Sequence, residues 1–213
     1  MATYNTEPFA IDYHNARLSG FKTEKTAKNK IVFSGDSMIE FGQWQDLLNN
    51  STIISRGILG DNSFGLLNRI DDIIGLQPKI LFVMIGINDI AGNIPIKVSL
   101  NNIGDFANQI IEHSPSTKIF VHSILPTNSV HSEHRAEFIN HYNKNDQVVA
   151  LNNLLKSQSD FLKFTFIDLY RHFTDERGNL NSEFANADGL HLNTKGYKLW
   201  ADLLNSENYM TKK

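Results

Sequence analysis

The segment Ile31-Val-Phe-Ser-Gly-Asp-Ser37 places a short apolar run directly before a glycine and two polar residues. An apolar run that is continuous rather than alternating is typical of a strand covered on both faces of a parallel sheet. In such sheets the functional groups lie beyond the carboxyl ends of the strands. The segment therefore predicts a strand over Lys30–Ser34 and places Ser37 at the functional edge of the sheet.

Four more runs of this kind follow, with stretches of helical period between them. The further predicted strands are 52–55, 80–85, 118–122 and 164–167. Four helices are predicted, and the third is the less regular stretch 133–156. The apolar faces of the other three are formed by Leu67, Ile70 and Ile74, by Leu100, Ile103, Ala107, Ile110 and Ile111, and by Tyr197, Trp200, Ala201 and Leu204. Asn193 or Thr194 is the expected N-cap of the last helix. This alternation predicts an α/β fold, a three-layer α/β/α sandwich around a five-stranded parallel sheet, doubly wound and flavodoxin-like.

No repeat, low-complexity tract or linker divides the chain. We expect a single domain over residues 1–213. An N-terminal arm, residues 1–29 with a helix around Ile11–Phe21, should precede a core that spans residues 30–205.

Composition excludes several classes of protein. The 213 residues are 41% hydrophobic and 20% charged, which is ordinary for a globular chain, and the net charge of −3 offers no basic surface for nucleic acid. There is no cysteine, so a thiol nucleophile and disulfides are excluded. No apolar run is long enough for membrane insertion and no signal peptide is visible, which favours a cytoplasmic protein, although a leader already removed would leave no trace.

Polar residues and glycines follow each predicted strand and form a chemically coherent set. The segments are Ser34-Gly-Asp-Ser-Met38, Arg56-Gly-Ile-Leu-Gly-Asp-Asn62, Gly86-Ile-Asn-Asp89 and, before the last helix, Asp188-Gly-Leu-His191. A serine hydroxyl becomes a good nucleophile when a histidine removes its proton and a carboxylate orients that histidine. The backbone amides of Ser37 and Gly60 and the side chain of Asn88 are candidate donors to the oxyanion that would form.

The order of these segments resembles the four sequence blocks of the SGNH (GDSL-type) hydrolase superfamily, and the first three are similar to its platelet-activating-factor acetylhydrolase-like branch. The resemblance implies that Ser37 is the nucleophile, that Gly60 and Asn88 are oxyanion donors, and that Asp188 and His191 complete a triad. It also implies hydrolysis of esters or thioesters of small acyl groups, with no metal and no organic cofactor. Met38 departs from the Leu or Ile common after the serine, without affecting the chemistry.

Other interpretations compete with this one. Ser37 taken alone could be a helix N-cap. The fold could serve as a non-catalytic carbohydrate-binding domain. A doubly wound signalling or flavin domain would need a phosphate-binding turn after the first strand, which is absent.

Several neighbouring polar residues are expected to have structural roles. We expect Asp36 to hydrogen-bond the turn backbone, because no second acid accompanies it to hold magnesium. Asp89 should brace the loop that aims Asn88. Asp61 and Asn62 are expected to cap the following helix.

The remaining histidines are given structural interpretations. His131, His134 and His141 form an H-x-x-H-x6-H pattern. Because charged and polar residues surround the first two, we interpret the cluster as a solvated helix start rather than a metal site. His122 ends a predicted strand and is expected to be a hydrogen-bonded core or rim residue that could line the cleft.

The substrate is expected to be a small-molecule ester. The loop Ser123–Ser129 follows the fourth strand and should border the cleft. Its polar side chains, together with Asn88, His122 and Arg56, favour a hydroxyl-rich leaving group such as an acetylated sugar. A lipid or lysophospholipid acylhydrolase or thioesterase is the alternative. The oligomeric state, with a homodimer among the options, is not set by the sequence.

Overall fold

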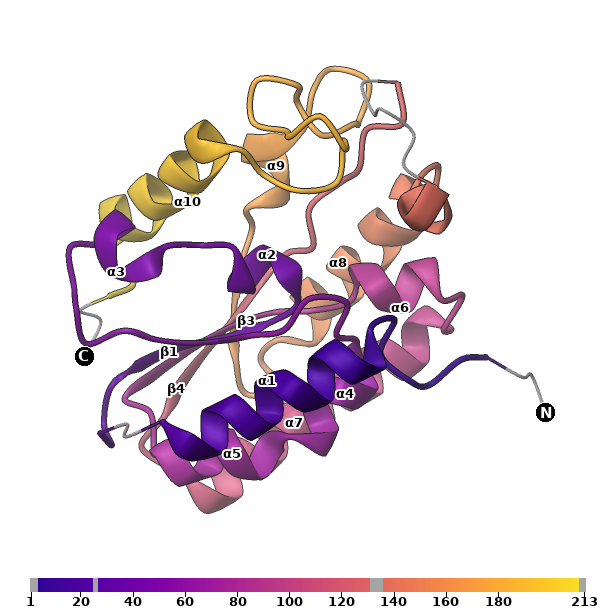
Figure 1. The fold of residues 1–213 in the computed structure, drawn as a ribbon. Coiled ribbons are helices and arrows are strands. Elements are labelled where there is room, and N and C mark those ends of the chain that lie inside the picture. Colours follow the sequence, from indigo (N-terminus) through magenta and orange to yellow (C-terminus); the bar gives the residue numbers. More distant parts are fainter. Residues whose placement is uncertain (1–3, 25–26, 131–135, 211–213) are drawn as a thin grey trace.

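Five parallel strands form the central sheet of the protein, for which a computed structural model describes residues 4–24, 27–130 and 136–210. The strands are β1 (Ile31–Gly35), β2 (Ile54–Gly57), β3 (Ile80–Met84), β4 (Lys118–His122) and β5 (Thr165–Ile167). Their order is β2-β1-β3-β4-β5, and every neighbouring pair is parallel. The predicted doubly wound α/β fold is confirmed (Figure 1).

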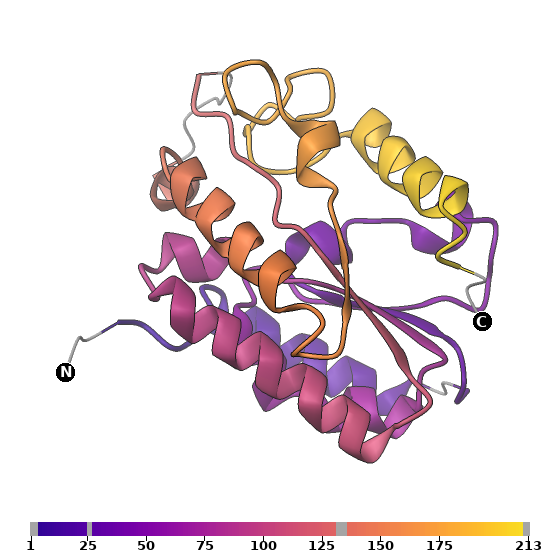
Figure 2. The ribbon, with the colours of Figure 1, turned by 180° about the vertical axis from the view of Figure 1, so that it is seen from behind.

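Helices cover both faces of the sheet, as Figures 1 and 2 show from opposite sides. On one face lie α4 (Ser63–Asn68), α5 (Ile70–Leu76), α6 (Ile87–Ala91), α7 (Ile96–His113) and α8 (Asn145–Gln158). On the other lie α2 (Ser37–Glu40), α3 (Trp44–Leu47), α9 (Tyr170–Phe173) and α10 (Thr194–Ser206). The helix α1 (Ile11–Thr23) and the short 3-10 helix η1 (Ala136–His141) complete the described elements.

Alternate residues of the central strands enter opposite cores, as the pleat of a strand requires. On β3, Leu81 and Val83 pack against α4, α5 and α7, whereas Phe82 and Met84 pack against α2, α3 and α10. All of β3 is buried. This two-sided burial explains why the strands appear in the sequence as continuous apolar runs.

The register of the strands brings three loops to one edge of the sheet. Gly35 at the end of β1 pairs with Gly57 of β2 and Met84 of β3, so these strands end level with one another. A Cβ atom at Gly35 would lie 1.9 Å from the carbonyl oxygen of Met84, so only glycine fits there. The segments that follow these strands therefore emerge side by side.

Two predicted helices are interrupted in the structure. The helix through Leu67 and Ile74 divides at Arg69, whose buried guanidinium turns inward and donates to Asp61 (2.9 Å) and to the carbonyl of Gly35 (3.1 Å). In the stretch 133–156, η1 and α8 are separate because Asn143 adopts a left-handed conformation (φ 59°) between them. The last helix begins as predicted, with the Asn193 side chain accepting from the N–H of Gly196.

His122 lies in the core rather than in the cleft, and both its ring nitrogens lack a hydrogen-bond partner within the described part of the chain. Its ring stacks on Phe82 at 5.4 Å and meets Trp200 edge-on at 5.2 Å. Burial lowers the pKa of His122 from 6.5 to about 3, so the ring is neutral at physiological pH. The hydrogen bonds expected of this histidine are not found among the residues that the structure describes.

We expect His122→Phe to remove part of the acid sensitivity of the fold. Because the folded-state pKa lies below the unfolded value, the unfolded chain binds the extra proton, and stability falls as pH drops below 6.5. At pH 5 the protonation of His122 in the unfolded chain lowers the free energy of unfolding by about 2 kcal/mol relative to pH 7. Urea unfolding at both pH values measures the difference, and an equal acid loss in the variant would contradict the assignment.

Within the described residues, no helix combines the length and the apolar character that a membrane crossing requires.

Candidate active site

Ser37 lies at the first turn of α2, directly after β1, and is buried. Asp36 is the N-cap of this helix, and its carboxylate accepts from the N–H of Met38 at 2.9 Å, which is the predicted turn role. Burial, together with the nearby Asp61 and Asp89, raises the pKa of Asp36 to about 8. The N–H of Ser37 lies in the first turn of α2, where backbone N–H groups have no acceptor within the helix.

Ser37, His191 and Asp188 form a continuous hydrogen-bonded chain. His191 Nε2 lies 2.9 Å from Ser37 Oγ, and His191 Nδ1 lies 2.8 Å from Asp188 Oδ2. The carboxylate accepts from Nδ1–H, which leaves Nε2 to accept from the serine hydroxyl. The three residues are 154 positions apart in the chain at their widest, and the structure brings them together as the sequence predicts.

The Asp188–His191 loop is held by several further hydrogen bonds. Asp188 Oδ1 accepts from the N–H groups of Leu190 and His191, both at 2.9 Å, and the Tyr142 hydroxyl donates to the carbonyl of Asp188 at 2.6 Å. Burial alone would raise the pKa of Asp188, but hydrogen bonds from the ring and backbone of His191 outweigh it and lower the pKa to about 2. The carboxylate is therefore ionised wherever the histidine can act as a base.

Gly60 and Asn88 lie in the same pocket as Ser37 and His191. Gly60 has φ +75°, a conformation that favours glycine, at the point where the loop after β2 passes the pocket. Asn88 is the second residue of α6, which follows β3, and it is buried. Its Nδ2 donates one hydrogen to the carbonyl of Asp61 at 2.7 Å, which leaves the second hydrogen of the amide available.

His141 is a residue of the site that sequence reasoning missed. Because Asn88 Nδ2 donates to Asp61, Asn88 Oδ1 is the acceptor of the 2.9 Å contact with His141 Nε2. His141 is buried rather than solvated, and this burial lowers its pKa to about 4, so the ring is a neutral donor. Phe138 and His141 lie three residues apart on η1, so they are on the same side of this 3-10 helix. That spacing is the sequence signal that could have placed both residues at the site.

Three polar residues brace the loops behind the site. Asp89 accepts from the N–H and the hydroxyl of Ser63, as expected of a bracing residue. Asn62 caps α4 by accepting from the N–H of Gly65 at 3.0 Å. Asp61 does not cap the helix as predicted. It is fully buried and pairs with the Arg69 guanidinium at 2.9 Å, because an ion must be paired in such a position.

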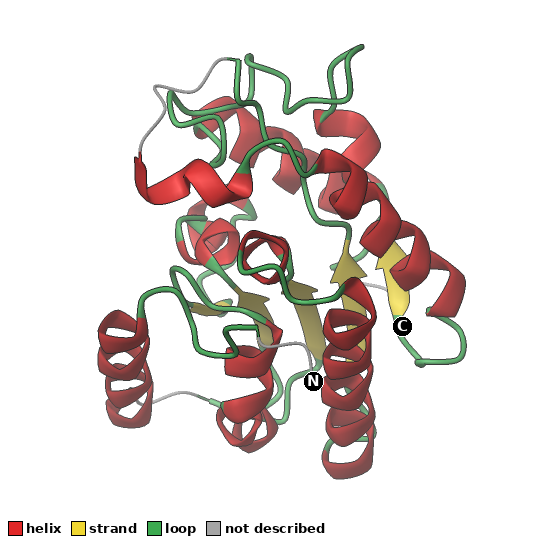
Figure 3. Ribbon diagram, turned by 90° about the vertical axis from the view of Figure 1, so that its right-hand side faces the viewer, coloured by secondary structure: helices red, strands yellow, loops and turns green. Residues whose placement is uncertain are grey.

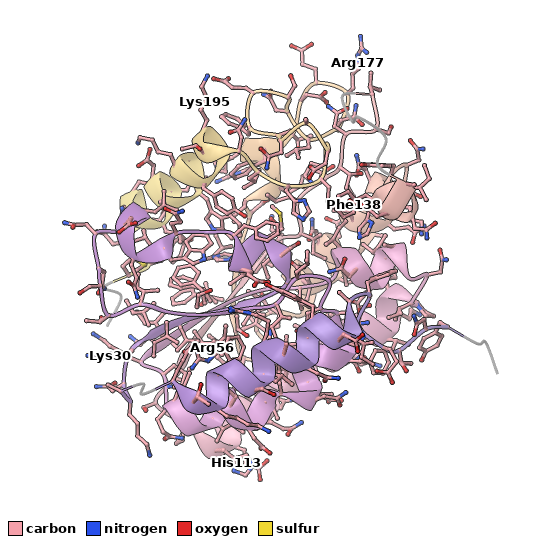
Figure 4. The ribbon with its side chains drawn as sticks, in the orientation of Figure 1. Lys30, Arg56, His113, Phe138, Arg177 and Lys195 are labelled. Carbon is pink, nitrogen blue, oxygen red and sulfur yellow. The ribbon has the colours of Figure 1, made fainter. Side chains whose placement is uncertain are left out.

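A pocket of about 300 Å³ opens above Ser37 and His191, and its other walls are largely apolar. Phe138 closes one side, with its ring 5.5 Å from that of His191 (labelled in Figure 4). Leu59 and Leu190 also line it, and Phe9 and Ala10 reach it from the N-terminal segment. Phe41, which is 45% exposed, lies 5.1 Å from the His191 ring.

Of the polar residues expected to border the cleft, Asn88 lines the pocket, whereas Arg56 and the loop Ser123–Ser129 lie elsewhere. Arg56 is buried on β2, where it pairs with Glu24 and Asp72 and lies 4.3 Å from the ring of Phe21, far from Phe138 in Figure 4. The loop Ser123–Ser129 packs inward, since both the N–H and the carbonyl of Ile124 bond the Asn152 side chain at 2.8 Å. The prediction that Arg56 and the loop Ser123–Ser129 border the cleft is therefore wrong.

The interpretation of His131 and His134 falls outside the described residues. Within the described ranges, no group of three or more His, Asp or Glu side chains is arranged to hold a metal ion.

The sequence model of the GDSL-like lipase/acylhydrolase family matches residues 33–199. The chain belongs to this family. The GDSL-like family, which lies in the SGNH superfamily, hydrolyses esters, so the protein is an ester-hydrolysing enzyme with the α/β sandwich of that superfamily. No curated protein sequence matches the chain.

Solved structures share the GDSL-like architecture over nearly the whole chain. A Streptococcus pneumoniae protein whose name refers to platelet activating factor has a TM-score of 0.81 and 26% identity, with 93% of this chain and 94% of that one covered. A GDSL-like lipase from Bacteroides thetaiotaomicron has a TM-score of 0.77 and 22% identity, with 96% and 100% covered. An acylhydrolase from Bacteroides fragilis has a TM-score of 0.76 and 22% identity, with 92% and 96% covered.

Proposed function

We propose that the protein is a serine esterase. Ser37 attacks the ester carbonyl, and the His191–Asp188 pair activates the Ser37 hydroxyl for this attack. The observation that carries the proposal is the 2.9 Å and 2.8 Å hydrogen-bonded chain from Ser37 Oγ through His191 to Asp188. As Oγ bonds to the carbonyl carbon, its proton passes to His191 Nε2. Asp188 keeps the ring in the tautomer that can accept it and stabilises the imidazolium.

The negative oxygen of the tetrahedral intermediate would accept from the amides of Ser37 and Gly60 and from Asn88 Nδ2. The intermediate then collapses as the bond to the alcohol oxygen breaks and His191 returns its proton to that oxygen. Water attacks the resulting acyl-enzyme by the same route and releases the acid. No cofactor enters any of these steps.

A small, mostly apolar void shares one lining residue, Leu190, with the pocket at Ser37. Its volume is about 10 Å³, which is about the space of one water-sized group. Its lining includes Met38, Ile87 and Leu190, each adjacent in sequence to one of Ser37, Asn88 and His191. Neither Ser37 nor His191 lines this void, so the proposal of acetyl esters rests on the pocket at Ser37, whose volume of about 300 Å³ must hold both the acyl group and the alcohol.

The apolar walls of the larger pocket favour an alcohol with an apolar or aromatic portion over a free sugar. Phe9, Leu59 and Phe138 offer surface for burial but few hydrogen-bond donors. The residues that favoured a hydroxyl-rich leaving group, Arg56 and the loop 123–129, bond elsewhere. The pocket thus supports the small-ester and lipid-like alternatives more than acetylated sugars.

The direct test is covalent labelling by a fluorophosphonate, which adds to an activated serine. We expect one label per chain, mapped by peptide mass spectrometry to Ser37, and loss of p-nitrophenyl acetate hydrolysis in step with labelling. Labelling of another residue, or none with activity intact, would contradict the proposal. A non-catalytic carbohydrate-binding domain would bind sugars and stay unlabelled.

A further inference from the structure

The N-terminal segment Glu7–Ala10 lies against the active-site pocket although it precedes the family-matched region, which begins at residue 33. We call this segment the strap. It leads into α1, which runs along the same side of the molecule as α4 and α5 in Figure 1. Figure 3 shows these helices from the side.

Two hydrogen bonds tie the strap to the loop Leu59–Asn62. The N–H of Phe9 donates to the carbonyl of Gly60 at 3.0 Å, and Asn62 Nδ2 donates to the carbonyl of Glu7 at 2.9 Å. The backbone of Ala10 also packs closely, since a Cβ atom at Gly60 would lie 3.2 Å from the nitrogen of Ala10. The loop that carries a candidate oxyanion donor is thus covered and bonded by the strap.

The helix that follows the strap is anchored to the same region. The Tyr13 hydroxyl donates to Glu40, which lies one turn beyond Ser37 on α2, and Arg17 pairs with the same carboxylate at 3.1 Å. Glu40 in turn accepts from the N–H of Leu59. The N-terminal arm, α2 and the Gly60 loop therefore form one connected set of contacts.

Phe9 supplies an apolar wall to the pocket. Its ring lies 5.7 Å from that of His141, which holds Asn88, and the side chain is 44% exposed. An aromatic ring that is half exposed at a pocket gains burial when a ligand covers it.

We propose that the strap is a positioning and specificity element of the active site. It holds the Gly60 loop so that the N–H of Gly60 faces the ester oxygen, and it places Phe9 against the substrate. This inference rests on the proposed esterase function. The physical reason is that Gly60, at φ +75°, has the backbone freedom of glycine, and the bond from Phe9 restrains the peptide unit that follows.

Asn62→Asp removes one of the two hydrogen bonds between the strap and the loop, leaves the bond from Phe9 to Gly60 in place, and puts an acid at a buried position next to Asp61. Aspartate still accepts from the N–H of Gly65 and keeps the helix cap, but it cannot donate to the carbonyl of Glu7. We expect kcat for p-nitrophenyl acetate to fall about tenfold, with a smaller change in KM, since small displacements of a catalytic group cost this much or more. The rate of labelling by a fluorophosphonate should fall in parallel, because its phosphoryl oxygen uses the same donors.

Phe9→Ala tests the wall without removing a hydrogen bond. We expect KM to rise about threefold to tenfold, more than kcat falls, and more for 2-naphthyl acetate than for p-nitrophenyl acetate. Matched controls are Asn68→Asp, which adds the same charge to an exposed position on α4, and Phe161→Ala, which removes an 80% exposed ring. Neither control should change KM or kcat.

Thermal unfolding of each variant separates a folding defect from a positioning defect, and Phe9→Ala carries the test if Asn62→Asp does not fold. Values of kcat and KM equal to those of the original protein in both variants would overturn the proposal. If Ser37→Ala retained activity, the proposed function itself would fail, and the two failures are thereby distinguishable.

Discussion

Replacing Ser37 with alanine should lower kcat/KM for p-nitrophenyl acetate by about 10⁵-fold to 10⁶-fold, equivalent to about 7–8 kcal/mol of transition-state stabilisation. The change removes only one oxygen atom, and it leaves the amide of residue 37 and the other donors in place. The loss is large because no neighbouring group can replace the proposed nucleophile, Ser37 Oγ, which His191 Nε2 contacts at 2.9 Å. Initial rates over a range of substrate concentrations measure it.

The double variant Ser37→Ala with His191→Ala sharpens this prediction. When two residues act together in one catalytic step, removing the second after the first costs little more activity. The double variant should therefore be about as inactive as either single variant. Ser157→Ala, at an exposed position on α8, is the control and should keep full activity. A loss of less than about tenfold in Ser37→Ala would exclude this serine as the nucleophile.

The fold is predictable because its signals are local. Each strand is a short apolar run, and the two-sided burial of β1 and β3 is what makes those runs continuous. The break at Arg69 is not local. Arg69 leaves the helix because its side chain reaches Asp61 and the end of β1, partners that helical periodicity does not reveal.

The candidate site also has a part that the sequence predicts and a part that it does not. Ser37, Gly60 and Asn88 each follow a strand, so the parallel sheet alone predicts that they meet. The walls of the pocket come from segments with no such marker. Phe9 reaches it from the N-terminal strap and Phe138 from η1, and only the packed chain places them there.

The prediction that Arg56 and His122 border the cleft is wrong for a related reason. Arg56 and His122 end strands at the functional edge, but a side chain at a strand end can point into either layer. Arg56 finds two carboxylates beside α1, and His122 points into the core between Phe82 and Trp200. Position along a strand indicates which edge a residue lies near, and the identity of its partners decides whether it faces substrate.

Replacing Asn88 with alanine should lower kcat by about 10²-fold to 10³-fold while KM changes little, because in the proposed mechanism its amide donates to charge that appears only in the transition state. The fold should tolerate the change less well than an exposed site would, since Nδ2 also bonds the carbonyl of Asp61 at 2.7 Å. A melting curve of the variant controls for this. Unchanged kcat in a folded variant would remove Asn88 from the oxyanion site.

His141→Ala extends this prediction to the residue that holds the amide. His141 Nε2 donates to Asn88 Oδ1 at 2.9 Å, and that bond keeps the amide nitrogen turned toward Asp61 and the pocket. We expect about a tenfold loss in kcat from His141→Ala, because a freed amide must be reoriented at each turnover. In a chain that already carries Asn88→Ala, the same change should cost almost nothing. Equal losses in the two backgrounds would instead indicate that His141 acts on the substrate directly rather than through Asn88.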